Sequence, residues 1–194
     1  MEYPGSDPFS SFGDQLSRRL LETRTIVVNE AITPSAAARL TKQFTLLDAE
    51  STGPIQCLMN SVPGGDDAAA LSLYDLMRSL TAPLTVLGGG RIAGAGVVAY
   101  LGAPAARRCA LPHVRFQFEP VRDPTDLGPD APPESRLEAI RDRRARIVGL
   151  IAAATGRPEA EVAADLSGHR GFDAEEAVAY GLVDRIVRSR DDLA

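Results

Sequence analysis

Residues 54–80 read PIQCLMNSVPGGDDAAALSLYDLMRSL, and this stretch decides the fold class of the chain. Residues 54–59 form a short, mostly apolar run that is typical of a buried strand. Pro63, Gly64 and Gly65 then predict a turn, and apolar side chains recur at helical spacing over residues 66–80. A strand, a turn and a helix in this order predict one unit of an α/β sheet.

The same alternation continues on both sides of this stretch. Further strands are expected at residues 25–30 and 84–87, within 110–120, and at 181–187. Further helices are expected at residues 14–22 and 33–50, before Leu101, at 135–156, from 157 onward and at 174–180. We interpret the glycines from Gly88 to Gly96 as a turn. Strands that alternate with helices predict βαβ crossovers and a largely parallel sheet.

One domain accounts for almost the whole chain. We expect a flexible N-terminal arm at residues 1–13, where Gly, Pro and Ser are frequent, and a short tail at residues 191–194. Residues 14–190 then form the domain, and the length of 194 residues is enough for one core. Five prolines between residues 120 and 135 predict a proline-rich insertion rather than a domain boundary, because the part that follows is too short to fold alone.

Charge and apolar content exclude several classes of protein. The net charge of −5 and the isoelectric point near 5.1 argue against a nucleic-acid surface. No stretch has the roughly 20 apolar residues of a membrane span, and no apolar segment near Met1 is typical of a signal peptide. Cys57 and Cys109 lie in apolar runs and are predicted to be buried free thiols in a reducing compartment. We therefore expect a cytoplasmic protein with no nucleic-acid or membrane partner.

A dinucleotide fingerprint is present only formally. Gly88, Gly90 and Ala93 have the spacing of that motif after a predicted strand. The motif usually opens a domain and is followed about 20 residues later by an acid that binds the ribose. Here it lies past residue 87, and the next acidic residue is Glu119. We therefore expect no nucleotide, no other cofactor and no metal.

Several motifs, taken in order, resemble the proteolytic subunit of Clp protease (ClpP). They are Arg24-Thr25-Ile26-Val27-Val28, the turn Asn60-Ser61-Val62-Pro63-Gly64-Gly65 with one inserted valine, Ala110-Leu111-Pro112, Thr155-Gly156 and AEEAVAYGLVD at 174–184. The resemblance covers about residues 15–190. It implies the ClpP/crotonase superfold, with a parallel sheet, βαβ crossovers and a long protruding helix. The last motif also occurs in crotonase-type hydratases, which share the superfold.

The resemblance implies a catalytic triad of Ser, His and Asp, but different residues stand at these positions. Counting back from Ala110-Leu111-Pro112 places Gly94 at the nucleophile position. The histidine position falls on Glu119, or on Phe118 if Pro120 is matched to the family's proline. The aspartate position falls on His169. None of the three triad residues is retained, so this chain is expected to be a degenerate member that lacks the family's serine-peptidase chemistry.

Other residues offer no obvious replacement for that chemistry. His113 lies six residues before Glu119, about 20 Å away along an extended strand. Ser72 falls within a predicted helix, and Ser61 precedes the turn, where a hydroxyl commonly bonds to the backbone. Peptide hydrolysis by a hydroxyl nucleophile also needs a base within about 3 Å, so we do not expect either serine to replace the missing nucleophile.

Two features leave room for different chemistry. The family's oxyanion donors would fall on the backbone N–H groups of Gly65 and Ala95, which survive side-chain changes, although these glycine turns also fit a purely structural role. Glu119 and His169 exchange the acid and the imidazole of the triad. They are interpreted either as a structural ion pair or as a pair that activates water, in the manner of the carboxylates of crotonase-type hydratases.

The resemblance also implies partners. The family forms heptameric rings and docks AAA+ ATPases through aromatic pockets, but Gln56, Leu58 and Ser79 stand at the corresponding positions, so such docking is doubtful. The proline-rich insertion replaces a glycine-rich strand that joins two rings. We expect a structural or regulatory subunit, in rings of itself or with a catalytic paralogue. Alternatives are a crotonase-like or altered hydrolase that uses Glu119 and His169, and a peptidase component active only beside a paralogous subunit.

Overall fold

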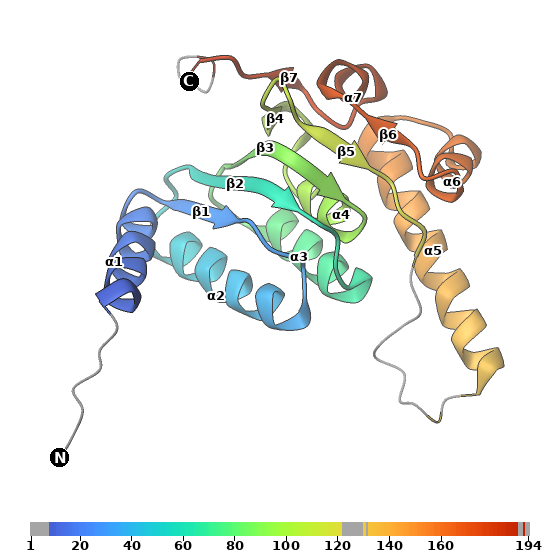
Figure 1. Cartoon of the computed structure of the whole chain (residues 1–194), viewed down its shortest axis with the longest axis horizontal. Coiled ribbons are helices and arrows are strands. Elements are labelled where there is room, and N and C mark those ends of the chain that lie inside the picture. Colours follow the sequence, from blue (N-terminus) through green and yellow to red (C-terminus); the bar gives the residue numbers. More distant parts are fainter. Residues whose placement is uncertain (1–7, 122–129, 131, 190–191, 193–194) are drawn as a thin grey trace.

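The computed structural model describes residues 8–121, 130, 132–189 and 192, and the side chains of residues 8–12 and 14 are not among the described parts. A seven-stranded, mostly parallel sheet forms the centre of the molecule (Figure 1). In chain order the helices and strands are α1 (Pro8–Glu22), β1 (Thr25–Val28), α2 (Pro34–Glu50), β2 (Ile55–Val62), α3 (Asp67–Ser79), β3 (Leu84–Ala93), α4 (Ala95–Tyr100), β4 (Arg108–Ala110), β5 (Arg115–Gln117), α5 (Pro133–Thr155), α6 (Glu159–Ser167), β6 (Gly171–Phe172), α7 (Ala174–Tyr180) and β7 (Arg185–Ile186).

Strand β3 organises the sheet. The main path runs β1-β2-β3-β4-β7, and all of these neighbours are parallel. The far end of β3 pairs with β5 instead of β4, and β5 pairs in turn with the antiparallel β6. A backbone hydrogen bond of 2.8 Å from Leu111 to Gly88 marks the point where the chain leaves β4. The expected βαβ crossovers and the largely parallel sheet are therefore present.

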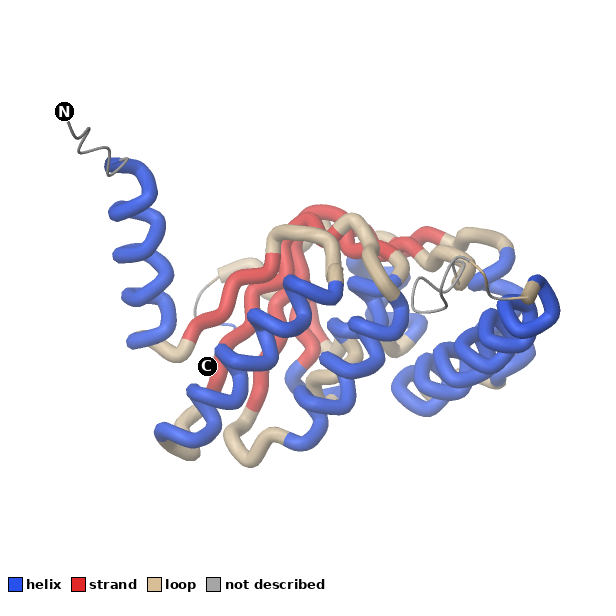
Figure 2. Tube along the Cα trace, turned by 90° about the horizontal axis from the view of Figure 1, so that it is seen from below, coloured by secondary structure: helices blue, strands red, loops and turns tan. Residues whose placement is uncertain are grey.

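Helices pack against one face of the sheet. Figure 2 shows α2 and α3 on one side of β1, β2 and β3, while α1, next to the N-terminus, stands apart beyond β1. On β2, the side chains of Ile55, Cys57 and Met59 are buried, whereas Gln56 is exposed and Leu58 is half-buried on the other face. This alternation follows from the two-residue period of a strand. The prediction of buried free thiols is confirmed, and burial raises the pKa of Cys57 to about 12.

Helix α5 is the long helix that the sequence predicted. Its buried side chains, Ile147, Val148, Ile151 and Ala152, all lie in the C-terminal half. The N-terminal half extends away from the sheet (Figures 1 and 2), and Leu137 there is 53% exposed. Gly156 ends the helix with a left-handed conformation (φ 73°), which glycine adopts without strain.

Arg24 ties the first βα unit together. Its guanidinium donates to the carbonyl oxygens of Leu47, Ser51, Gly53 and Pro54, at 2.8, 3.0, 2.8 and 3.3 Å. These carbonyls belong to the end of α2 and to the loop before β2. Unpaired carbonyls at a helix end favour a cation, so this arginine connects the start of β1 to the start of β2.

The glycine-rich segment differs from the expected turn. Strand β3 continues through Gly88, Gly89 and Gly90 as far as Ala93. These glycines serve close packing, since a β-carbon on Gly88 would lie 3.0 Å from Ile92 and one on Gly89 would lie 2.9 Å from the Asn60 side chain. Likewise β2 continues to Val62, through residues expected in the turn. The turn predicted at Gly88–Gly96 was therefore wrong in extent, and only its end at Gly94 changes the chain direction.

One helix boundary and two short strands also differ from expectation, since neither β4 (Arg108–Ala110) nor β6 (Gly171–Phe172) was predicted. Helix α1 begins at Pro8 rather than at Asp14, which suits a proline that lacks an N–H and has a helical φ. Strand β6 was not anticipated because two residues give no periodic signal. Most of the proline-rich insertion, residues 122–129 and 131, lies outside the described residues, as do residues 1–7 of the arm and most of the tail. Among the helices that are described, none is long and apolar enough to cross a membrane.

Candidate functional site

The turn between β3 and α4 forms the centre of the candidate site. Gly94 stands alone between Ala93, the last residue of β3, and Ala95, the first of α4. Its backbone has φ 46° and ψ −118°, and its N–H donates to the Gln117 carbonyl at 3.0 Å. A sharp strand-to-helix turn of this kind is where hydrolases expose a nucleophile. Here the turn has that shape, but Gly94 places no side chain there.

Glu119 lies directly beside this turn. A β-carbon on Gly94 would stand 2.8 Å from Glu119 Oε2. The other carboxylate oxygen, Oε1, accepts a hydrogen bond from Arg91 Nη2 at 3.1 Å. The Glu119 side chain is 17% exposed and that of Arg91 is 54% exposed. The carboxylate is therefore held between the guanidinium and the glycine turn.

Phe118, the alternative at the histidine position, points into the core. It is 1% exposed, and its ring makes edge contacts with Phe172 at 5.0 Å and Tyr180 at 5.8 Å between ring centres. Neighbouring residues of an extended chain point to opposite sides. Of the two candidates, the one beside Gly94 is thus Glu119.

The main chain around His169 lies beside the main chain around Glu119, but the His169 ring does not pair with the Glu119 carboxylate. The Phe118 N–H donates to the Arg170 carbonyl at 2.9 Å, and the Gln117 side-chain amide donates to the carbonyl of His169. His169 itself is exposed and has a left-handed φ of 54°. Among the described residues, no hydrogen bond or ion pair joins its ring to the Glu119 carboxylate. The acid–imidazole pair that the sequence suggested is not formed, because the carboxylate turns toward Arg91 and Gly94.

A polar and aromatic network supports the segment that carries His169. Asp165 is 16% exposed, accepts a hydrogen bond from the Tyr180 hydroxyl at 2.9 Å and pairs with Arg170 at 3.0 Å. The Arg170 guanidinium also lies over the rings of Phe172 and Tyr180, at 4.9 and 5.2 Å. Burial and the hydrogen bond to Asp165 raise the pKa of Tyr180. This network fixes the loop between α6 and β6.

The predicted oxyanion donors lie at the ends of two neighbouring strands. Gly65 follows β2 in a turn with φ 143°, where a β-carbon would lie 2.5 Å from the Ile32 carbonyl oxygen. That turn is held by two backbone bonds of 2.9 Å, from Ile32 to Gly64 and from Asp66 to Ile32, neither of which uses the Gly65 N–H. Ala95 is the first residue of α4, so its N–H has no acceptor within the helix.

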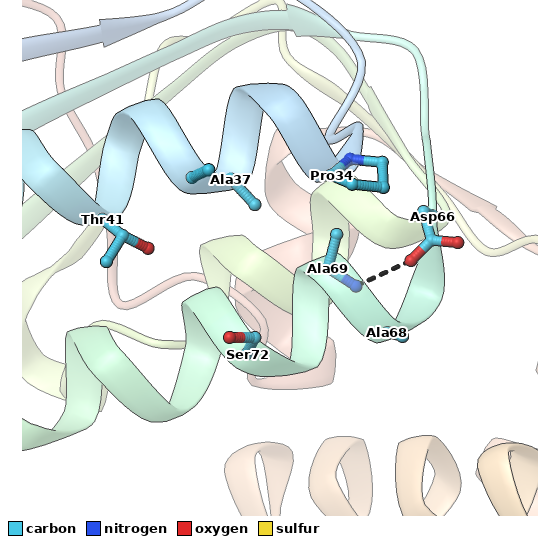
Figure 3. Close-up of a pocket in the computed structure, with 8 residues that line it drawn as sticks. Pro34, Ala37, Thr41, Asp66, Ala68, Ala69 and Ser72 are labelled. Carbon is cyan, nitrogen blue, oxygen red and sulfur yellow. Dashed lines mark hydrogen bonds between the residues drawn. The ribbon is translucent and has the colours of Figure 1, made fainter. Parts of the chain in front are cut away.

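A hollow of about 430 Å³ lies between α2 and α3, next to the Gly65 turn (Figure 3). Its walls carry small side chains, among them Ala37 and Thr41 on α2 and Ala69 and Ser72 on α3. Asp66 at its rim accepts a hydrogen bond of 2.7 Å from the Ala69 N–H and so caps α3. Ser72 therefore belongs to a groove between two helices that contains no histidine.

Arg91 is the site residue that the sequence reasoning missed. Because Gly88–Gly96 was interpreted as a turn, no strand face was assigned to Arg91. In the sheet, Arg91 is in register with Arg115 on β5, so both side chains lie on the same face. Arg115 itself lies two residues before Gln117, whose register partner is Ala93. Among the residues that the structure describes, no three His, Cys, Asp or Glu side chains are placed to hold a metal ion.

Comparison with known proteins identifies the family. The sequence profile described as Clp protease matches residues 10–190. The chain belongs to the Clp protease family. It is 32% identical to the ATP-dependent Clp protease proteolytic subunit 3 of Rhizobium etli over 182 residues, which cover 93% of this chain and 92% of that protein. It is also 32% identical to subunit 1 of Streptomyces avermitilis over 189 residues, covering 97% of this chain and 87% of that protein.

The fold of the Clp protease family is confirmed by solved structures. ClpP1 from Listeria monocytogenes superimposes with a TM-score of 0.81 and is 29% identical, covering 92% of this chain and 99% of that chain. The ClpP-type fold predicted from the motifs is therefore correct. Family members are named as proteolytic subunits, and ring assembly with other ClpP subunits is general in the family, which suits a chain of this fold.

The three positions matched to the family's docking aromatics lie near one end of β2 and α3. Gln56 is exposed and is in register with Thr25 and Thr85 on the neighbouring strands. Leu58 is half-buried between Val27 and Leu87 in the same way. Ser79 ends α3 and donates its hydroxyl to the Leu76 carbonyl at 2.8 Å. Two of these three side chains are polar, and none of them is aromatic.

Proposed function

We propose that this chain is a ClpP-type ring subunit that does not cleave peptide bonds and has a structural or regulatory role. It would assemble with itself, with a catalytic paralogue, or with both, and modulate proteolysis. We place this assembly in the cytoplasm, because two buried free thiols suit a reducing compartment, and we expect weak or no docking of an AAA+ ATPase.

The arrangement of Gly94 and Glu119 carries this proposal. A peptidase of this family needs a hydroxyl at the β3–α4 turn, and Gly94 supplies none. A neighbouring base is also required, and the nearby side chain is a carboxylate bound to Arg91. Loss of a hydroxyl nucleophile lowers peptidase turnover by about a millionfold, so one of these changes alone is enough to abolish cleavage.

Two exposed surfaces support assembly. The N-terminal half of α5 extends from the body and exposes Leu137. The sheet face around Val27 and Leu58 is only partly covered, whereas parallel sheets are usually covered on both faces. Both surfaces are suited to contact with other subunits.

The experiment combines particle mass with labelling. Mass photometry of the purified chain, alone and co-expressed with a catalytic ClpP from the same genome, is expected to give ring-sized particles in at least one case. A serine-directed fluorophosphonate and a fluorogenic peptide are expected to give no signal from this chain alone. A stable monomer under both conditions would count against the ring subunit. Labelling of the native chain that disappears after heat denaturation would mean that the chain has a reactive nucleophile after all.

A peptidase that works only beside a paralogue is the second candidate. It is favoured by the names of the relatives, which are proteolytic subunits. In that case mixed rings cleave faster per catalytic subunit than rings of the paralogue alone. The same co-expressed sample, assayed with the fluorogenic peptide, separates this candidate from a passive structural subunit.

A further inference from the structure

An apolar row crosses the open face of the sheet, which is the face turned away from α2 and α3 (Figure 2). Strand register places Val27, Leu58 and Leu87 side by side on β1, β2 and β3, and each of these side chains is half-buried. Parallel sheets are usually covered on both faces. An aliphatic side chain from a partner would therefore complete the burial of this row.

A polar row lies beside the apolar row and ends in a positive charge. Thr25, Gln56 and Thr85 are in register, each two residues before a member of the apolar row. Arg107, an exposed residue in the turn before β4, donates to Thr85 Oγ1 at 3.3 Å and extends this row. In the described part of the chain no carboxylate pairs with its guanidinium. Because the side chains on one strand face repeat every two residues, the two rows are about 6.6 Å apart.

The outer face of α2 carries the complementary pair of side chains. The buried residues of this helix lie on the side that faces its own sheet. Leu46 is 50% exposed, and Glu50, four residues later, is exposed as well. Glu50 makes no ion pair with any side chain that the structure describes. Residues four apart lie on one face of a helix, about 6 Å apart along its axis, and this separation matches that of the two rows.

We propose that the open sheet face of one chain binds the outer face of α2 from a second copy of the same chain. Leu46 of the second copy packs on the apolar row, and its Glu50 pairs with Arg107. These two contacts orient α2 antiparallel to β3, because the apolar row follows the polar row along each strand. The inference rests on the ring subunit proposed above and identifies its partner.

The contact joins two different faces, so it is heterologous. Within one chain, α2 and the open face lie on opposite sides of the sheet (Figure 2), and each copy can therefore contact two neighbours. Heterologous contacts repeat from copy to copy and generate a ring where the rotation closes. A subunit that lacks an acid at the place of Glu50 would leave Arg107 without a counter-charge, so the contact selects for a copy of this chain.

Mass photometry of the full chain and of surface variants tests this contact. The wild type alone is expected to give ring-sized particles. Leu46→Arg puts a charge on the apolar row, whereas Glu50→Arg or Arg107→Glu puts two like charges opposite one another. Each of these three changes is expected to raise the concentration at which half of the particles dissociate about tenfold or more.

The double variant and a control make the test specific. Glu50→Arg combined with Arg107→Glu restores opposite charges and is expected to return that concentration to within about threefold of the wild-type value. Glu175→Arg, a change at an exposed glutamate on α7, serves as the matched control and is expected to assemble as the wild type does. Circular dichroism melting checks that every variant is folded.

The outcomes separate this inference from the proposed function. Assembly that is insensitive to Leu46→Arg, or a double variant that does not recover the assembly lost in the single variants, would overturn the contact. Rings that form only on co-expression with a catalytic paralogue would overturn the second copy as the partner but leave the ring subunit in place. A monomer in both samples would overturn both proposals.

Discussion

Glu119 Oε2 lies 2.8 Å from the point where a β-carbon on Gly94 would stand. That separation is shorter than β-carbons in proteins tolerate, so a side chain at position 94 and the present Glu119 rotamer exclude one another. The two residues come from different segments, the β3–α4 turn and the stretch that follows β5. The loss of a side chain at one position and the presence of a carboxylate at the other are physically coupled.

This coupling predicts non-additive stabilities. Gly94→Ala should destabilise the fold by about 2 kcal/mol, because alanine is strained at φ 46° and its β-carbon meets Glu119. In a double-mutant cycle with Glu119→Ala, part of that loss should be recovered, with a coupling of about 1 kcal/mol. Urea unfolding of the four proteins measures it. Gly13→Ala, where a β-carbon would meet nothing within 4 Å in the interior of α1, is the control and should be neutral or stabilising. A coupling near zero would mean that Glu119 moves aside freely.

Arg24 is predicted to contribute strongly to stability. Arg24→Ala removes bonds to four carbonyl oxygens and should lower the free energy of unfolding by about 2–3 kcal/mol. The free energy of unfolding of Arg24→Lys should lie between those of the wild type and Arg24→Ala, since an ammonium group cannot bond to all of the same carbonyls. Arg39→Ala, which breaks an exposed ion pair with Glu30, should change stability by less than about 1 kcal/mol. Equal effects at the two arginines would contradict the bridging role of Arg24.

Arg108 allows a test in which two substitutions are expected to affect stability differently. Arg108 is 3% exposed and donates to the Ala154 carbonyl at 2.8 Å, but Nε and Nη1 have no partner among the described residues. Burial lowers the pKa of this guanidinium. Arg108→Met should be neutral or stabilising, because it removes a buried charge and keeps the volume, whereas Arg108→Ala should destabilise by about 2 kcal/mol through a cavity. Thermal melts of both variants, compared with the wild type, measure these changes in stability. Strong destabilisation by methionine would show that the charge is needed.

Cys57 predicts a loss of stability at alkaline pH. Burial raises the pKa of Cys57 from 9.0 to about 12 in the folded protein. Unfolded chains therefore release this proton first as the pH rises, so the free energy of unfolding is full below pH 9 and falls above it. Between about pH 10 and 11 the decrease from this thiol should approach about 1.4 kcal/mol per pH unit. Cys57→Ala should remove that slope in urea unfolding, while native Cys57 should resist thiol reagents. If Cys57→Ala kept the same pH dependence of the free energy of unfolding, a group other than Cys57 would be responsible for it.

The order of helices and strands was largely predictable from local patterns. Strand β2 and helix α3 were visible because an apolar run, a Pro-Gly-Gly turn and a helical repeat follow one another in residues 54–80. Helix α7 was predicted with its correct ends, where Asp173 and Glu176 form a capping box and Gly181 adopts a left-handed φ of 91°. Such features depend on neighbours in the chain, which sequence reasoning can see.

The path through Gly88–Ala93 was not predictable in the same way. Glycines usually indicate turns, but here they extend β3 because Asn60 and Ile92 approach too closely for a β-carbon. That approach depends on β2 and on the packing against the sheet, which are distant contacts. Arg91 was missed for the same reason, since its strand face exists only once β3 has formed.

By itself, the sequence determined the fold family and the absence of a hydroxyl at position 94, because both depend on residue types at fixed spacing. It placed Glu119 at the histidine position and kept Phe118 as the alternative, since the two ways of matching the motif differ by one residue. Only the tertiary structure decided between them. The ring of Phe118 is buried against Phe172 and Tyr180, and this forces the next side chain outward to Gly94 and Arg91.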